Sequence, residues 1–402
     1  MEYYAAKINE NGAIAVDDSI LVKGAESTYG SKILMGFKPL FSAEAVERLE
    51  KNGYLVSGKC HVGEFGLDLV GEFSHYAQED TKLEGAAAAL VAKSDVKAAL
   101  GVDGKGARCR HVNGAPRRAA ALANVDFLKP TYGTVSRYGI ISTAASGEQV
   151  GVYAPDTQGV KEVMGVIAGH DDKDGTSLRT QTYEYHTDED IAGKRVCIVK
   201  ELLEIADAET QENVRAFAKK LTDKGVTVEE ISCDFFEMAN TAWQILMSAE
   251  TCNNISRFDG VKYGRRAENY KNIDELYVNS RTEGFNFLTK AVILYGSDVL
   301  SKNRYKDCYD KSLRIRRVVA EKFAALMKEY DAVLTPACSK TSYERYDIYA
   351  AFEKVYEESI FTSVANLIGI PALVSRKVQL MGGHFSESIL LSMAGAVEKE
   401  GE

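Results

Sequence analysis

The sequence lacks the cysteine patterns that mark disulfide-rich or zinc-binding proteins. Its 402 residues include seven cysteines, an odd number, and no two of them form a CxxC pair. Cysteines at fixed spacing are typical of disulfide frameworks in secreted domains and of structural zinc sites. We therefore expect reduced thiols, as in a cytoplasmic protein.

Long apolar runs are absent as well. No stretch approaches the roughly 20 apolar residues that a membrane-spanning helix needs. The N-terminus, from Met1 to Lys7, has no basic segment followed by an apolar core, which a secretory signal would require. The sequence predicts a cytoplasmic chain with no membrane segment.

The sequence also lacks signs of a domain boundary and motifs for binding a cofactor. It contains no internal repeat, no low-complexity segment and no linker rich in proline and serine, so we expect one domain over residues 1–402. Histidines and acidic residues are not grouped at metal-binding spacing, and neither a metal nor another cofactor is predicted. The net charge of -9 argues against a surface that is wholly a nucleic-acid footprint.

Hydrophobic patterning predicts an α/β fold. Residues 3–23 are expected to contain two short strands around a turn, and residues 43–51 a helix with Ser42 as its N-cap. A second helix is predicted over residues 82–100. This alternation of strand and helix favours a mixed, twisted sheet covered by helices on both faces.

The patterning continues to the C-terminus. An amphipathic helix is predicted over residues 155–168, and a second strand–helix unit begins at residue 194. Residues 238–328 are predicted to be almost wholly helical. A buried strand at 331–336, a closing hairpin at 372–380 and a final helix at 386–399 complete the expected elements.

The stretch from residue 83 to residue 146 carries the most informative motif. It opens on an alanine run, passes a glycine-rich basic loop between Gly104 and Arg118, and ends on the block KPTYGTVSRYG from Lys129 to Gly139. This block resembles that of the amidase signature family, and most closely that of the A subunits of Glu-tRNA(Gln)/Asp-tRNA(Asn) amidotransferases, which release ammonia from glutamine. Further blocks resemble the family in the same order: Val22 to Leu34, Ile167 to Asp171, Tyr263 to Glu268, Arg281 to Phe285 and Ala365 to Ala372.

The resemblance implies a single α/β domain whose mixed sheet is wrapped by helices. Compared with the family, the chain lacks roughly the first 50 to 60 residues of the usual helical N-terminus. Residues 372–379 also cross directly what is normally a long glycine-rich loop. We therefore expect an abridged version of the family's domain.

The family's chemistry, as the resemblance implies it, needs a serine nucleophile, a second serine that relays the proton and a lysine that acts as the base. A free hydroxyl is a weak nucleophile until an adjacent base removes its proton. Asp17 occupies the lysine's place and Leu83 that of the relay serine. The nucleophile's place falls on Ala107 when counted from upstream and on Ala115 when counted back from Lys129. The chain is therefore predicted to be inactive as a serine–lysine amidase.

The positions that the resemblance assigns to the glutamine pocket are changed too. The family's A subunits carry a basic pair and an aspartate there, suited to the carboxylate and amino group of glutamine. Their counterparts in this chain are Ala291 with Val292, and Ser359, beside which Glu358 supplies an acid. The predicted substrate site is thus altered along with the catalytic residues.

Two other chemistries stay open at the altered loop. Cys109 lies close to His111 in sequence and could form a thiolate nucleophile, and Asp17 could serve in a rewired enzyme of the same family. The loop is also the most basic stretch of the chain and could bind tRNA or a nucleotide through charge. The candidate ligand-binding residues are Lys105, Arg108, Arg110, His111, Arg117 and Arg118.

The sequence as a whole favours a non-catalytic protein on an amidase-signature scaffold. Its predicted role is that of a binding or scaffolding subunit, with a partner that resembles the amidotransferase B or C subunits. The alternatives are a rewired amidase or amidotransferase-type enzyme that uses Cys109 or Asp17, and tRNA or nucleotide binding by residues 105–118.

Overall fold

One mixed sheet runs through the molecule. The computed structural model describes residues 3–69, 73–76, 85–104, 115–344 and 346–398. Within these ranges the sheet has eleven strands in the order β1-β3-β2-β4-β6-β5-β10-β11-β9-β7-β8. The strands are β1 (Tyr4–Lys7), β2 (Ile14–Asp17), β3 (Val56–Cys60), β4 (Ala98–Asp103), β5 (Asp126–Lys129), β6 (Gln149–Ala154), β7 (Arg195–Val199), β8 (Thr227–Ile231), β9 (Ala332–Pro336), β10 (Ala372–Ser375) and β11 (Val378–Met381).

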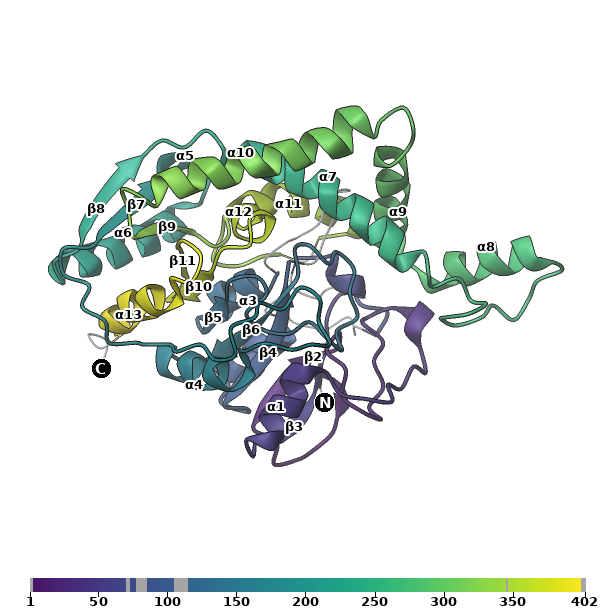
Figure 1. Cartoon of the computed structure of the whole chain (residues 1–402). Coiled ribbons are helices and arrows are strands. Elements are labelled where there is room, and N and C mark those ends of the chain that lie inside the picture. The colour runs from purple at the N-terminus through teal and green to yellow at the C-terminus, as the bar shows by residue number, and fades with distance from the viewer. Residues whose placement is uncertain (1–2, 70–72, 77–84, 105–114, 345, 399–402) are drawn as a thin grey trace.

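Helices cover both faces of this sheet (Figure 1). The fold class that the patterning and the resemblance predicted is confirmed. The α-helices are α1 (Glu44–Lys51), α2 (Ala86–Ala92), α3 (Ala115–Ala123), α4 (Thr157–Ile167), α5 (Lys200–Glu204), α6 (Ala208–Asp223), α7 (Phe236–Ile255), α8 (Ile273–Gly284), α9 (Phe287–Val299), α10 (Lys311–Leu326), α11 (Ile348–Glu358), α12 (Ser363–Leu367) and α13 (Glu387–Glu398). Short helical turns are η1 (Lys32–Leu34), η2 (Glu64–Gly66), η3 (Lys306–Asp310) and η4 (Ser359–Phe361).

The predicted C-terminal hairpin is confirmed, and it joins the two halves of the sheet. β10 and β11 pair antiparallel, from Ala372 with Met381 to Ser375 with Val378. On its outer sides the hairpin pairs with β5 and with β9. The N-terminal strands and the β9-β7-β8 group therefore form one continuous sheet only because this late segment lies between them.

Two helical layers enclose the sheet and bury its two faces. On one face α1, α4, α6 and α13 pack a single apolar core against the strands, with Val46, Val160, Val214 and Leu390 each fully buried. On the other face α2 and α3 cover the N-terminal strands, while α7, α10 and α12 cover the hairpin and β9. Alternate residues of a strand point to opposite faces, so each buried strand contributes to both cores.

Two local predictions are wrong, and contacts with distant parts of the chain account for both. The helix expected over residues 82–100 ends at Ala92 within the described residues, and residues 98–103 form β4, which is buried between β2 and β6. An alanine-rich stretch has a high helix propensity, but pairing on both sides overrides it. Ser42 is not the N-cap of α1; Ala43 holds that position, and the Ser42 hydroxyl accepts a hydrogen bond from the Lys23 amide instead.

Candidate functional site

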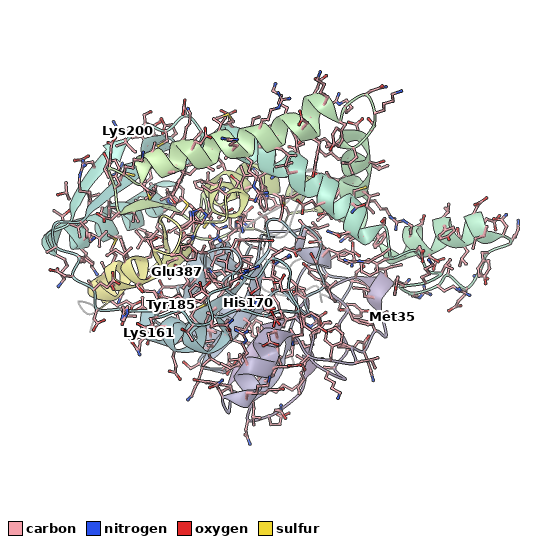
Figure 2. The ribbon with its side chains drawn as sticks, in the orientation of Figure 1. Met35, Lys161, His170, Tyr185, Lys200 and Glu387 are labelled. Carbon is pink, nitrogen blue, oxygen red and sulfur yellow. The ribbon has the colours of Figure 1, made fainter. Side chains whose placement is uncertain are left out.

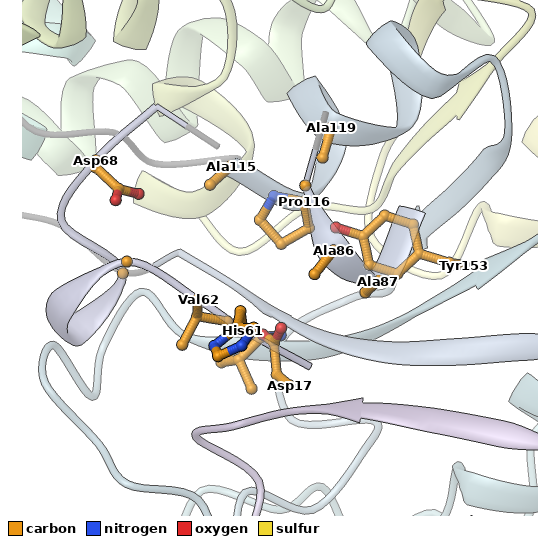
Figure 3. Close-up of a pocket in the computed structure, with 14 residues that line it drawn as sticks. Asp17, His61, Val62, Asp68, Ala86, Ala87, Ala115, Pro116, Ala119 and Tyr153 are labelled. Carbon is orange, nitrogen blue, oxygen red and sulfur yellow. The ribbon is translucent and has the colours of Figure 1, made fainter. Parts of the chain in front are cut away.

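A small cavity lies where three parallel strands end. β2 runs parallel to both β3 and β4, so the carboxyl ends of the three strands meet at one edge of the sheet. In open α/β sheets this edge is where ligands usually bind. The cavity has a volume of about 50 Å³, and a single water needs about 10–15 Å³. Its described lining consists of Asp17, His61, Val62, Gly63, Gly66, Asp68, Gly85, Ala86, Ala87, Val102, Ala115, Pro116, Ala119 and Tyr153 (Figure 3).

Two positions that the resemblance assigned to catalysis meet in this cavity. Asp17 is the last residue of β2, and Ala115 is the first residue of α3. Leu83 and Ala107, the other positions considered, lie outside the described residues. The structure thus places in one cavity the two residues that the resemblance matched to a lysine and a serine.

Asp17 is held in place by the neighbouring strand. Its Oδ2 accepts a hydrogen bond of 2.8 Å from the Val102 amide of β4, and only 8% of the residue is exposed. The carboxylate therefore adds one hydrogen bond between β2 and β4 after their last backbone pair, Val16 with Leu100. A carboxylate in this position can accept hydrogen bonds from a bound group or take up a proton.

His61 and Tyr153 add two further polar groups to the lining. Burial lowers the pKa of His61, which favours the neutral imidazole. Burial, with the nearby charge of Asp17, raises the pKa of Tyr153 well above its ordinary value, so the phenol stays protonated. In the described part of the lining there is no serine, threonine, cysteine or lysine. The His61 imidazole and the Tyr153 phenol can donate hydrogen bonds to a small polar ligand and accept hydrogen bonds from it.

Cys60, which precedes His61, is not a poised nucleophile. Its side chain is fully buried at the end of β3. Burial, followed by the charges of Asp17 and Asp18, raises the pKa of the thiol well above its ordinary value. A thiol in such surroundings is inert, because only the thiolate is strongly nucleophilic.

The glycine-rich basic loop was predicted to extend to Arg118, and this is wrong for its last residues. Arg117 and Arg118 lie in the first turn of α3 and are fully buried. Arg117 donates from Nε and Nη2 to the Asp103 carboxylate at 2.9 and 3.1 Å. It also donates to Gln379 Oε1 at 2.6 Å, to the Thr362 carbonyl at 3.0 Å and to the side chain of Asn366.

These contacts give Arg117 a positioning role. Asp103 ends β4, Asn366 lies in α12 and Gln379 lies in β11, so one guanidinium ties the start of α3 to three separate elements. Arg118 donates to the Leu69 carbonyl at 3.2 Å and the Glu358 carbonyl at 3.4 Å. The other predicted ligand-binding residues, Lys105, Arg108, Arg110 and His111, and the candidate nucleophile Cys109, lie outside the described residues.

Sequence reasoning missed the one lysine that is buried close to Asp17 in the described part of the chain. Lys59 of β3 is fully buried and forms an ion pair of 3.0 Å with Asp18, and it also donates to the Ser27 hydroxyl. Burial lowers the pKa of Lys59. Its ammonium does not reach the described lining of the cavity, because it is engaged with Asp18. Only the pairing of β3 with β2 brings it close to Asp17, so the sequence held no signal for this lysine.

The residues predicted to replace the glutamine pocket differ in burial. Val292 in α9 and Ser359 are fully buried, whereas Ala291 is half-buried. The Glu358 carboxylate accepts hydrogen bonds from the Ser339 amide at 2.9 Å and from the Ser339 hydroxyl. Glu358 is thus engaged in the fold near Arg118, rather than lining the cavity at the strand ends.

Two features are absent from the residues that the structure describes. No group of three or more histidine, cysteine, aspartate or glutamate side chains there could hold a metal ion. Across the same ranges, no helix has both the length and the hydropathy needed to cross a bilayer.

Comparisons with known proteins give a consistent result. The family model described as Amidase matches residues 13–390. The chain is 32% identical over 410 residues to the A subunit of glutamyl-tRNA(Gln) amidotransferase from Lacticaseibacillus paracasei, covering 97% of this chain and 83% of that protein. It is 36% identical over 411 residues to the corresponding protein of Ectopseudomonas mendocina, covering 96% and 83%. The crystal structure of the Thermotoga maritima counterpart superposes with a TM-score of 0.78 at 26% identity, covering 99% of this chain and 87% of that one.

Proposed function

Because the chain belongs to the amidase family and is strongly similar to glutamyl-tRNA(Gln) amidotransferase A subunits, we propose that it is a non-catalytic member with a binding or scaffolding role. The observation that carries this proposal is that Asp17 and Ala115 both line the cavity at the strand ends. An alanine has no atom that can attack a carbonyl. A carboxylate held by the Val102 amide lacks the amine that would activate a serine.

The residues around the cavity support the proposal that the chain keeps the family's fold but does not hydrolyse amides. Arg117, Asp103 and Asn366 still fix the start of α3 behind Ala115 through charged hydrogen bonds in a fully buried position. The cavity offers acceptors on Asp17 and Asp68, and a neutral imidazole on His61, to a small polar group. Binding a ligand needs only such complementary donors and acceptors, whereas hydrolysis needs a nucleophile and its base.

Hydrolysis of glutamine and simple carboxamides by the purified full chain tests the proposal. We expect ammonia release no faster than with heat-denatured protein. A variant carrying Asp17→Lys, Leu83→Ser and Ala115→Ser is the informative companion, because a gain of turnover would identify these positions as the former catalytic ones. Turnover by the unmodified chain that disappears with Asp17→Asn or Cys109→Ala would overturn the proposal and favour a rewired enzyme.

A partner-binding surface fits the scaffolding role. The relatives are named as subunits, and α8 with its flanking segments projects from the body of this chain (Figure 1). Three large apolar side chains on this projection are exposed: Ile273 by 52%, Tyr277 by 37% and Val278 by 61%. Exposed apolar groups gathered on one element mark an interaction surface. A protein resembling the amidotransferase B or C subunits is the candidate partner.

Co-purification with such a protein, followed by measurement of the mass of the complex in solution, tests this surface. Val278→Asp is expected to weaken the complex at least tenfold, because a charge would be buried without a partner. Val318→Asp on α10, where the valine is 41% exposed, is the matched control and should leave binding unchanged. Equal effects of the two substitutions would remove α8 from the interface.

A further inference from the structure

A second and larger cavity lies away from the strand ends. Its volume is about 670 Å³, within the range of about 300–1,000 Å³ typical of small-molecule sites. Met35, at the base of the α8 projection, marks its position (Figure 2). The apolar part of its wall, named here the apolar floor, consists of Leu21, Ile33, Leu34, Met35, Phe37, Ile140, Ile141 and Phe258.

Ile33 fixes one part of the apolar floor. Ile33 is fully buried, and both Gly264 and Gly284 press against it so closely that an added Cβ would lie 3.0 and 2.6 Å from its side chain. The Ile33 carbonyl also accepts a hydrogen bond of 2.6 Å from the Arg265 amide. The segment before α8 is therefore locked onto η1. This part of the wall is therefore ordered before any ligand binds.

One cation on the wall has no carboxylate partner among the described residues. The two arginines of the lining are Arg257 and Arg265, and Arg265 is paired with Glu283 at 2.9 Å. Arg257 instead donates to the Ser142 carbonyl at 2.8 Å, and its guanidinium lies 5.3 Å from the centre of the Phe258 ring. In the part of the chain that the structure describes, no carboxylate forms an ion pair with Arg257.

Arg257 is thus oriented and still has unused donors. A guanidinium carries five N–H donors, and the bond to Ser142 uses one of them. Arg257 is exposed at the cavity wall; partial burial of its guanidinium lowers the pKa, and the charge of Glu148 acts in the opposite direction. A planar guanidinium with free donors is the group that proteins use to bind carboxylates in a bidentate manner.

We propose that this cavity binds an apolar monocarboxylate, with the carboxylate on Arg257 and the hydrocarbon part against the apolar floor. The ligand class follows from the combination of apolar walls with one oriented cation that no described carboxylate neutralises by direct pairing. The source of the carboxylate is either a free alkyl or aryl acid or the C-terminus of an apolar peptide. This site is separate from the cavity at the strand ends and does not depend on the proposed function.

Calorimetric titration of the full chain tests the proposal with octanoate, octanol and octylamine as probes. Octanoate should bind most tightly, octanol more weakly and octylamine not measurably. Shortening octanoate by one methylene should weaken binding about fourfold, because each buried methylene contributes about 0.8 kcal/mol. N-acetyl-leucyl-leucine and its C-terminal amide form a second arm, and the tighter of the two acids identifies the source.

Two substitutions separate the charge from the cavity. Arg257→Gln should weaken octanoate at least tenfold and change octanol less than twofold, since only the charge-assisted bonds are lost. Ile141→Trp should weaken both by filling the apolar space. Arg317→Gln, which removes an exposed arginine on α10, is the matched control and should change neither. Octanoate and octanol binding equally, octanoate binding that Arg257→Gln leaves unchanged, or the absence of saturable octanoate binding would each overturn the proposal.

Discussion

Replacing Arg117 with alanine should destabilise the whole fold. Its guanidinium is fully buried and bonded to the Asp103 carboxylate, to Gln379, to Asn366 and to the Thr362 carbonyl. Alanine removes the cation but leaves the carboxylate in the core. Among the described residues, the hydrogen bond of 2.7 Å from Asn366 Nδ2 would then be the remaining side-chain contact to the Asp103 carboxylate.

The expected loss is large compared with the total stability. Removing one member of a buried ion pair costs about 3–5 kcal/mol, because the other charge stays buried without its partner. Native domains are stable by about 5–15 kcal/mol. Arg117→Ala should therefore remove about a fifth or more of the free energy of unfolding. Urea unfolding, followed by circular dichroism and by the fluorescence of Trp243, which is fully buried in α7, measures this loss.

Two controls make the result interpretable. Arg317→Ala removes an arginine that is paired with Glu321 at 2.8 Å on the exposed face of α10, and its cost should be about 0–1 kcal/mol. Adding Asp103→Asn to Arg117→Ala should recover part of the stability, because the unpaired charge is removed. A decrease below about 1 kcal/mol for Arg117→Ala, or no recovery in the double variant, would refute the reasoning.

The same buried arginines affect how nucleic-acid binding is tested. Arg117→Ala would weaken any binding by unfolding the protein rather than by removing a phosphate contact. The salt dependence of binding is therefore better probed with Arg108→Ala and Arg110→Ala, both outside the described residues. Each substitution that removes an arginine bound to a phosphate should lower the salt slope by about 1.

The remaining predictions concern pH and backbone conformation. Burial raises the pKa of Glu64 to about 7 from its ordinary 4.5. Its contribution to stability is therefore fully present below pH 4.5 and is lost as the pH rises through 7. In urea unfolding, Glu64→Gln should abolish the decrease of about 3 kcal/mol in the free energy of unfolding over that pH range. Burial lowers the pKa of Lys129 to about 7 from 10.5. Between these pH values the unfolded chain binds one more proton than the folded chain, so the free energy of unfolding should rise from pH 7 to 10.5. Urea unfolding of Lys129→Met over this pH range should lack the rise. Gly104→Ala should lower the urea midpoint of unfolding more than Gly53→Ala. Both glycines have positive φ (97° and 83°), but only at Gly104 would the added Cβ meet a backbone oxygen, at 1.8 Å. Equal effects would show that the backbone moves to make room for the Cβ.

Elements with a strong local pattern were predicted well. The amphipathic helix expected over residues 155–168 is α4, with Asp156 as its N-cap, and the strand–helix unit from residue 194 is β7 with the helices that follow. The C-terminal hairpin pairs as expected. These segments alternate or repeat at the period of their own secondary structure, so the chain itself carries the information.

Elements whose identity depends on distant partners were predicted poorly. Residues 98–100 were assigned to the end of an alanine-rich helix, yet they belong to β4, which pairs with β2 and β6. β6 itself, at residues 149–154, was not predicted, although it lies between β4 and β5. Strand propensity depends on the neighbouring strands, and these are not adjacent in sequence.

For the candidate site, too, some features were predictable from the sequence and others depended on the tertiary structure. The sequence alone led to the prediction that Asp17 and an alanine stand where the family's blocks carry a lysine and a serine, because matching blocks by residue identity needs no coordinates. Only the tertiary structure decided that Asp17 and Ala115 face one cavity, and that Arg117 is buried rather than part of an exposed basic loop. The physical reason is the cost of burying a charge: Arg117 can lie in the core only because Gln379, 262 residues away in sequence, and Asp103 meet it there.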